Sequence, residues 1–349
     1  MMRTIKIGNR LVGAGHPCLI IAEAGSNHNG SLEQAQRLID IAVDAGADVV
    51  KFQLFRASKL YPTTAGECDY LEWKKSIYDI IREMELPIDW LRPLADHSMK
   101  RNIMFLVSPF DEESVDQVDP YVEFFKIASY ELTHIPLVKH IAKKGKPVLI
   151  STGAASMDDV HATVRAFTET GNDQLMLMQC TASYPAPVDS LNLKTIPTLI
   201  SEFQIPVGLS DHSRDPILAP IAAVALGANL IEKHYTFSNQ LPGPDHKFAI
   251  EPHELRKLVD AVRTTERALG TGAKEILPAE DELYRFARRC IFTVKPVAAG
   301  ETFSPENVAV LRKGKHEAGL SPEAWEWVLG RVARKDIPAE TPLTRTLVG

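Results

Sequence analysis

The sequence lacks the features that mark several classes of protein. Its four cysteines are far apart and form no Cys-x-x-Cys pair, so neither a disulfide framework nor a zinc cluster is expected. No apolar run approaches the roughly 18 residues that span a bilayer, and the opening MMRTIKIGNRLVG holds no apolar signal segment. Lysine and arginine number 39 against 45 acidic residues, and the net charge of −6 argues against a nucleic-acid-binding protein. We therefore expect a cytoplasmic protein that binds neither nucleic acid nor a membrane.

Eight short apolar runs alternate with amphipathic stretches along the chain. Such runs predict β-strands, and intervening patterns such as SLEQAQRLIDIAVDAGA predict helices. The alternation indicates a parallel α/β fold, and eight strands favour a closed (β/α)₈ TIM barrel over an open doubly wound sheet. The predicted strands are residues 18–25, 48–53, 103–109, 123–129, 147–152, 175–181, 206–211 and 229–235.

Two intervals depart from this regular alternation. Residues 54–102 are about twice as long as a usual strand-to-strand interval, and we interpret them as an extended loop that covers the barrel mouth or as an inert decoration. Beyond residue 270 the pattern becomes a linker and then short β-like pieces with prolines. The sequence therefore predicts a catalytic barrel over 1–270, a linker over 271–287 and a small, mostly β domain over 288–349.

Polar side chains gather toward the carboxyl ends of the predicted strands, although a strand buried on both faces is expected to stay apolar. In a barrel these ends form one rim, which is where active sites lie. The alternative is that the lysines pair with carboxylates only to fix the barrel. The positions are Glu23, Lys51, Gln53, Ser108, Lys126, Ser129, Ser151, Thr152, Gln179, Thr181, Ser210, Asp211, His212, Glu232, Lys233 and His234.

Three kinds of side chain on this rim indicate a chemistry. Lys51 and Lys126, with short hydroxyl donors around them, suit a phosphorylated anionic ligand. His212 and His234 end neighbouring strands, and two imidazoles with open coordination positions suit a catalytic divalent metal. Asp211 and Glu232 of the same strands are reserve ligands or partners that orient the ligands. Glu23 is followed by the polar cluster SNHNG, and its carboxylate can act as a base, orient a hydroxyl or neutralise a lysine.

Eight motifs taken together resemble the sialic acid synthase family, and the C-terminal segment resembles the antifreeze-like, or SAF, domain that the family carries. The resemblance covers essentially the whole chain. It implies a (β/α)₈ barrel with a SAF domain, and an enzyme that condenses phosphoenolpyruvate with an N-acylated hexosamine. The motifs are IAEAGSNHNG (21–30), AGADVVKFQ (45–53), FKIASYE (125–131), VLISTG (148–153), CTASYPAP (180–187), GLSDHS (208–213), GANLIEKHY (227–235) and LPGPDHKF (241–248).

The resemblance also implies roles for single residues. His212 and His234 are the implied ligands of Mn²⁺ or Mg²⁺, and Glu23 is the implied catalytic carboxylate together with the two lysines. Arg289 of the SAF domain is the implied sugar-binding residue that each subunit of a domain-swapped homodimer contributes to its partner. Implied to bind phosphoenolpyruvate are Lys51, Ser108, Lys126, Ser129, Ser151 and Ser210. Implied to bind the sugar are Gln53, Tyr184, Asp245 and Arg289.

The sequence departs from the family pattern at two places. The third strand reads VSPF where the family often has STPF, so only Ser108 carries a hydroxyl, and Ala182 stands where the family often has an asparagine. The substrate is therefore left open between N-acetylmannosamine and a diacetamido-trideoxyhexose, although Asp245 in PGPD favours the sialic or legionaminic branch over the pseudaminic one.

Two other functions compete with the synthase. A class I aldolase would form a Schiff base on a barrel lysine such as Lys126 or Lys233. A non-enzymatic sugar-binding or ice-binding module would explain the small C-terminal domain, but it leaves the ionisable rim without a purpose.

Overall fold

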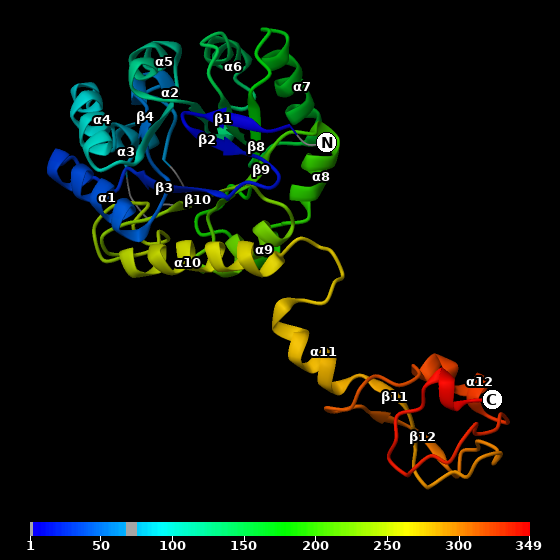
Figure 1. The fold of residues 1–349 in the computed structure, drawn as a ribbon. Coiled ribbons are helices and arrows are strands. Elements are labelled where there is room, and N and C mark those ends of the chain that lie inside the picture. Colours follow the sequence, from blue (N-terminus) through cyan, green and yellow to red (C-terminus); the bar gives the residue numbers. More distant parts are fainter. Residues whose placement is uncertain (1–2, 68–74) are drawn as a thin grey trace. The chain divides into compact units, whose positions relative to one another are not determined.

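A computed structural model describes residues 3–67 and 75–349 of the chain. The chain divides into two compact units, Met1–Gly270 and Thr271–Gly349 (Figure 1). Part of the long interval expected at 54–102, residues 68–74, lies outside the described residues.

The first unit contains an eight-stranded parallel sheet in the part of the chain that the structure describes. The strand order is β5-β4-β3-β10-β9-β8-β7-β6, and the two end strands, β5 and β6, contact each other, which closes the sheet into a barrel. The predicted (β/α)₈ barrel is thus confirmed. The strands are β3 (Leu19–Gly25), β4 (Val49–Leu54), β5 (Met104–Pro109), β6 (Phe125–Ile127), β7 (Val148–Ser151), β8 (Leu175–Cys180), β9 (Val207–Asp211) and β10 (Leu230–His234).

Helices surround the barrel strands (Figure 1). Their starts follow from local chemistry, since the side chain of Ser31 accepts a hydrogen bond from Gln34 N, and Ser156 forms a capping box with Asp159. The helices are α1 (Leu32–Ala45), α2 (Ala57–Leu60), α3 (Ile77–Glu83), α4 (Leu91–Lys100), α5 (Glu112–Val118), α6 (Ile135–Ala142), α7 (Met157–Thr168), α8 (Thr195–Phe203), α9 (Leu218–Ala225) and α10 (Pro252–Leu269).

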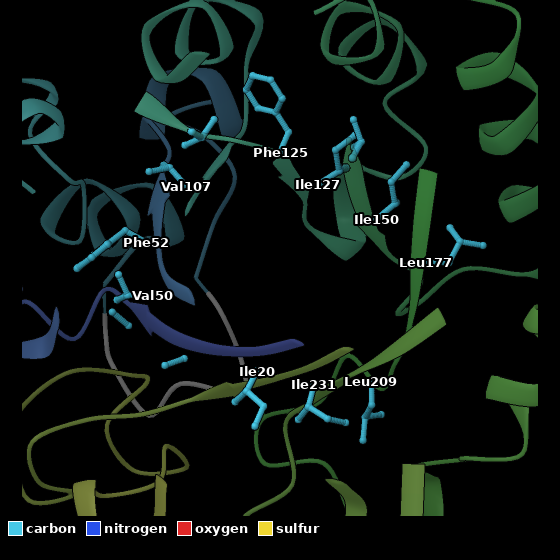
Figure 2. Packing of buried hydrophobic residues seen from close by; sticks show 14 of the residues in the cluster. Ile20, Val50, Phe52, Val107, Phe125, Ile127, Ile150, Leu177, Leu209 and Ile231 are labelled. Carbon is cyan, nitrogen blue, oxygen red and sulfur yellow. The ribbon is translucent and has the colours of Figure 1, made fainter. Parts of the chain in front are cut away.

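Alternation along each strand separates two apolar clusters. The larger cluster lies between the strands and the helices, and Figure 2 shows its members, such as Ile20, Leu209 and Ile231, on the side of the strands away from the barrel interior. The residues next to them along the strands face inward and form a second cluster, which includes Ile21 and Leu230. Burying each such side chain stabilises the fold by about 1.5–3 kcal/mol.

A short hairpin that the sequence pattern did not predict closes the barrel at its amino end. Strands β1 (Ile5–Ile7) and β2 (Arg10–Val12) pair antiparallel, and Ile5, Ile7 and Val12 join the inner apolar cluster. Arg10 and Arg263 both form ion pairs with Asp48, which precedes β4. The amino end of the barrel is therefore filled, and the inward-facing polar residues are left at the carboxyl end.

The second unit has its own small core. Strands β11 (Arg289–Thr293) and β12 (Val308–Arg312) pair antiparallel over a cluster that includes Ile291, Phe303 and Leu343. Val297 and Ile337 form a further antiparallel bridge. Helices α11 (Asp281–Ala287) and α12 (Trp325–Val328) complete the unit.

Candidate active site

The carboxyl half of the barrel interior is lined by polar side chains from neighbouring strands. Inward-facing positions alternate, so Ile21 is followed by Glu23, Val49 by Lys51, and Leu230 by Glu232. The alternation that buries the inner apolar cluster at the amino end therefore places ionisable groups inside the barrel at the carboxyl end.

Two lysines and two glutamates form a buried quartet at the centre. Lys51 Nζ lies 2.9 Å from Glu23 Oε2 and 3.3 Å from Glu232 Oε1. Lys126 Nζ lies 3.5 Å from the same Glu232 oxygen. All four side chains are at most 4% exposed. Two positive and two negative charges thus balance in a space that water scarcely reaches, and an anionic ligand has to enter against the two carboxylates.

The quartet perturbs the ionisation of its members in opposite directions. Burial raises the pKa of Glu23, and the ammonium of Lys51 only partly offsets it. Burial also favours a raised pKa for Glu232, but the ammonium groups of Lys126 and Lys51 outweigh it and hold that pKa below its ordinary value. Burial lowers the pKa of Lys126, and Glu232 restores it only in part. Carboxyls whose pKa values are pushed apart are typical of sites that move protons.

Two serine hydroxyls contact this quartet, and two more lie at the carboxyl ends of β6 and β7. Ser108 Oγ accepts a hydrogen bond from Lys51 Nζ at 3.3 Å, and Ser210 Oγ donates to Glu232 Oε1 at 3.2 Å. Ser129 Oγ accepts from the N–H of Gly153 at 3.1 Å. Ser151 is buried, and its Oγ has no hydrogen-bond partner among the described residues. Because a buried hydroxyl without a partner is costly, Ser151 is suited to a ligand that supplies one.

The two histidines also come together. The rings of His212 and His234 lie 5.4 Å apart between centroids, at an interplanar angle of 64°. Nδ1 of His212 lies 2.9 Å from the carbonyl oxygen of Thr181; it donates there, so Nε2 is left with a free lone pair. Burial lowers the pKa of His234 well below its ordinary value, which keeps its imidazole neutral.

These two histidines fit a divalent metal. The buried Nδ1 of His234 has no hydrogen-bond partner among the described residues, and a neutral imidazole is the form that binds a metal. Within the described part of the chain, no cluster of three or more His, Cys, Asp or Glu side chains is arranged to hold an ion. A metal here would therefore take the two imidazoles and complete its shell with water or substrate, as catalytic sites do.

Asp245 and Tyr184 lie on the histidine side of the site. Asp245 Oδ2 is 3.9 Å from Nδ1 of His234 and accepts a hydrogen bond from the Ser26 hydroxyl at 3.3 Å. The Tyr184 ring stands 4.3 Å from the His212 ring, between centroids. The backbone at residue 25 passes so close to Asp245 that only glycine fits, because φ there is +53° and a Cβ would lie 2.7 Å from Asp245 Oδ2.

The remaining sugar-binding candidates, Gln53 and Arg289, belong to different units of the chain. Gln53 is on β4, and its Nε2 donates to Glu23 Oε1 at 2.7 Å, so it touches the lysine–glutamate quartet. Arg289 begins β11 of the second unit, where its side chain is exposed and donates to the carbonyl oxygen of Val310.

Some rim residues do not face the barrel interior. Lys233 Nζ donates hydrogen bonds to Asp211 and to the carbonyl oxygens of Ser213 and Asp215. Lys233 and Asp211 therefore form an ion pair on the outward side of their strands. These contacts leave Lys233 and Asp211 paired with each other, which does not favour Lys233 as a Schiff-base lysine or Asp211 as a metal ligand. Glu232 forms its ion pairs with the two lysines, and it also interacts electrostatically with His212. Period-two counting back from His234 along its strand would have placed Glu232 inside and Lys233 outside.

Glu131 is a buried residue of the barrel that the rim pattern missed. It ends the short 3₁₀ helix Ser129–Glu131 after β6, and its Oε2 has no hydrogen-bond partner among the described residues. Burial raises its pKa to about 7, and Lys126 opposes that shift. No sequence signal beyond its place in FKIASYE marked it.

Comparison with known proteins agrees with this geometry. Residues 38–274 match the NeuB family, and residues 288–348 match the SAF domain. The chain is 43% identical to the spore coat polysaccharide biosynthesis protein SpsE of Bacillus subtilis, over 97% of this chain and 96% of that protein. It is 39% identical to N,N'-diacetyllegionaminic acid synthase of Campylobacter jejuni, over 91% of this chain and 96% of that protein.

A solved structure is similar as well. The N-acetylneuraminic acid synthetase of Leptospira borgpetersenii, determined with citrate, is 35% identical and matches with a TM-score of 0.73, over 81% of this chain and 96% of that one. The chain belongs to the NeuB family of nonulosonic acid synthases and carries a SAF domain.

Proposed function

We propose that this protein condenses phosphoenolpyruvate with an open-chain N-acylated hexosamine and releases phosphate by cleavage of the C–O bond. The observation that carries the proposal is the convergence of Lys51, Lys126, His212 and His234 on one barrel end, with Glu23 between cations and sugar candidates. C3 of phosphoenolpyruvate attacks the sugar aldehyde, water adds at C2, and the tetrahedral intermediate expels phosphate.

The lysine side of the site is suited to the three-carbon phosphoester. The ammonium groups of Lys51 and Lys126 attract its phosphate and carboxylate, and Ser108, Ser129 and Ser210 provide short donors beside them. The unpartnered Ser151 hydroxyl is free to add one more. Because the ligand is itself anionic, it competes with Glu23 and Glu232 for the two ammonium groups. The two carboxylates then lose part of their compensating charge, and their protonation becomes coupled.

Glu23 is the group best placed to handle the proton of the reaction. It joins Lys51 on the phosphoester side to Gln53 on the sugar side through contacts of 2.9 and 2.7 Å. Because burial raises its pKa, it holds or takes a proton nearer to neutral pH than an ordinary glutamate does. We assign it to proton transfer or to stabilising positive charge as it develops at C2.

The histidine side is suited to the sugar and to a divalent metal, Mn²⁺ or Mg²⁺. His212 and His234 would hold the ion, which as a Lewis acid polarises a carbonyl oxygen. Asp245 and Gln53 present acceptors and donors for sugar hydroxyls, and the Tyr184 ring offers an apolar face. The similarity to a legionaminic acid synthase favours a diacetamido-trideoxyhexose as the sugar, ahead of N-acetylmannosamine.

We further propose that the protein is a cytoplasmic homodimer in which Arg289 completes the site of the partner subunit. Large apolar side chains of the linker and α11, Ile276, Leu277, Leu283 and Phe286, are exposed in the single chain, which supports burial against a second copy. Among the described helices none is long and apolar enough to cross a membrane.

Phosphate release tests the proposed reaction. The purified protein is mixed with phosphoenolpyruvate, Mn²⁺ and either N-acetylmannosamine or a diacetamido-trideoxyhexose. We expect phosphate only when a sugar is present, and a product whose mass equals both substrates plus water minus phosphoric acid. Release that is independent of every acylated hexosamine, or unaffected by EDTA, would contradict the proposal.

A class I aldolase remains the alternative on one observation, because burial lowers the pKa of Lys126 and a neutral amine is what Schiff-base chemistry requires. Borohydride trapping distinguishes the two functions. A stable adduct on Lys126 would favour the aldolase, whereas the synthase leaves the lysine unmodified.

A further inference from the structure

The loop that carries Asp245 is anchored by a histidine that the proposed reaction does not use. His246 is fully buried. Its Nδ1 lies 2.6 Å from the Thr236 hydroxyl, within the same loop, and its Nε2 lies 3.0 Å from Asn29 Oδ1. Asn29 belongs to the SNHNG motif that follows β3, so one imidazole ring joins the loops after two neighbouring strands.

The ring is suited to a fixed, uncharged bridge. Because Asn29 Oδ1 accepts, Nε2 carries the proton, and Nδ1 then accepts from the Thr236 hydroxyl. Burial lowers the pKa of His246 to about 4, so the ring stays neutral near neutral pH. The fit is close, since a Cβ on Gly243, where φ is +139°, would lie 2.8 Å from Cδ2 of the ring.

A third loop is tied into the same arrangement. Asn239 Nδ2 donates to the carbonyl oxygens of His246 and Ala249. Arg214, two residues after His212, donates to Asn239 Oδ1 at 3.1 Å. We call Asn29, Arg214, Thr236, Asn239 and His246 the clasp; it connects the loops after β3, β9 and β10.

The clasp lies directly beside Asp245 along the chain. Asp245 directly precedes His246, and its Oδ2 reaches the Ser26 hydroxyl at 3.3 Å and Nδ1 of His234 at 3.9 Å. The hydrogen bond that Asp245 Oδ2 accepts from the Ser26 hydroxyl is long at 3.3 Å, whereas the imidazole of His246 makes two shorter bonds, at 2.6 and 3.0 Å. Removing the ring leaves the loop without its connection to Asn29.

We propose that His246 is a positioning residue for sugar binding, which acts through Asp245 by holding the two loops together. This inference rests on the proposed function, in which Asp245 contacts the sugar. His246 itself touches neither substrate, and the lysines that hold phosphoenolpyruvate lie on other strands.

Three substitutions test the role of His246. His246→Phe keeps a ring and removes both bonds, whereas His246→Gln restores a donor near the position of Nε2. We expect His246→Phe to raise KM for the sugar by about ten- to hundredfold and to leave KM for phosphoenolpyruvate within about twofold, with His246→Gln recovering part of the loss. His97→Phe is the matched control, because it removes a ring-nitrogen bond of 3.0 Å between α4 and Asp40 of α1, away from the mouth.

A double-mutant cycle separates positioning from general destabilisation. In an Asp245→Ala background, His246→Phe should have little further effect on KM for the sugar, because the group through which it acts is gone. Fully additive effects, or equal increases of both KM values, would overturn the inference. So would an unchanged KM in a folded His246→Phe protein.

A structural measurement keeps the inference separate from the proposed function. If no acylated hexosamine supports phosphate release in the wild-type protein, the proposed function fails and kinetics no longer apply. A crystal structure of His246→Gln and of His246→Phe then decides the positioning claim. Asp245 should keep its contact with Ser26 in the first and lose it in the second; an unmoved Asp245 in both would refute the claim.

Discussion

Replacing Glu232 by glutamine tests whether the buried quartet is poised for an anion. Among the described residues, Glu232 is the one carboxylate within ion-pair distance of Lys126, at 3.5 Å. Glutamine keeps the size of the side chain and an acceptor for Ser210, but it removes one of two negative charges facing two buried ammonium groups. The variant therefore holds an uncompensated buried cation.

The expected cost is large for a single isosteric substitution. Removing one partner of a buried ion pair destabilises a protein by about 3–5 kcal/mol. An anionic ligand reverses part of this loss, since it neutralises the same cations and no longer meets the repulsion of Glu232. We expect phosphoenolpyruvate to stabilise the Glu232→Gln protein by about 1–3 kcal/mol more than it stabilises the wild type.

Urea unfolding with and without phosphoenolpyruvate measures both quantities. The control is Glu83→Gln, which removes an exposed ion pair with Lys75 of 2.7 Å and should cost at most about 1 kcal/mol. The reasoning is refuted if Glu232→Gln costs no more than the control, or if phosphoenolpyruvate stabilises both proteins equally.

Three further outcomes follow from single residues. Gly25→Ala places a Cβ 2.7 Å from Asp245 Oδ2 at a φ of +53°, and steady-state kinetics should show a higher KM for the sugar; an unchanged KM would mean that the loop adapts freely. The pKa of Glu131 is raised to about 7, so its stabilising effect is complete below its unfolded pKa and is lost as pH rises through about 7. Relative to the wild type, Glu131→Gln should therefore gain about 3 kcal/mol between about pH 5 and about pH 8 in urea unfolding, and a pH-independent difference would contradict this. Mixing inactive Arg289→Ala and His212→Ala subunits should restore some turnover if subunits share sites; no recovery despite exchange would show that each chain completes its own.

The barrel was predictable because its strands are regular. Each of the eight predicted runs contains or overlaps an observed strand, for example 48–53 against Val49–Leu54. The amino-terminal hairpin was missed because IKI and RLV are only three residues each, too short for a period to emerge. These short strands are stabilised by packing against the apolar cluster inside the barrel, a contact between distant parts of the chain that a local sequence pattern does not show.

The sequence predicted which residues line the site better than it predicted which of them form ion pairs. Strand alternation and the rim rule were enough to bring Lys51, Lys126 and Glu23 together. The partner of each charge depends on side-chain reach across strands, so the sequence did not show that Glu232 lies within ion-pair distance of two ammonium groups. The hydrogen bond between His246 and Asn29 joins residues that are 217 positions apart, so no local sequence pattern predicts it.

The fate of the bridging oxygen of phosphoenolpyruvate tests the central claim most directly. The substrate is prepared with a heavy oxygen isotope between carbon and phosphorus, and the released phosphate is analysed by phosphorus NMR after turnover with the preferred acylated hexosamine. The proposed reaction breaks the C–O bond, so the phosphate should carry all of the label. Label retained in the sugar acid would mean that the P–O bond breaks instead, and the mechanism built on this barrel mouth would be wrong.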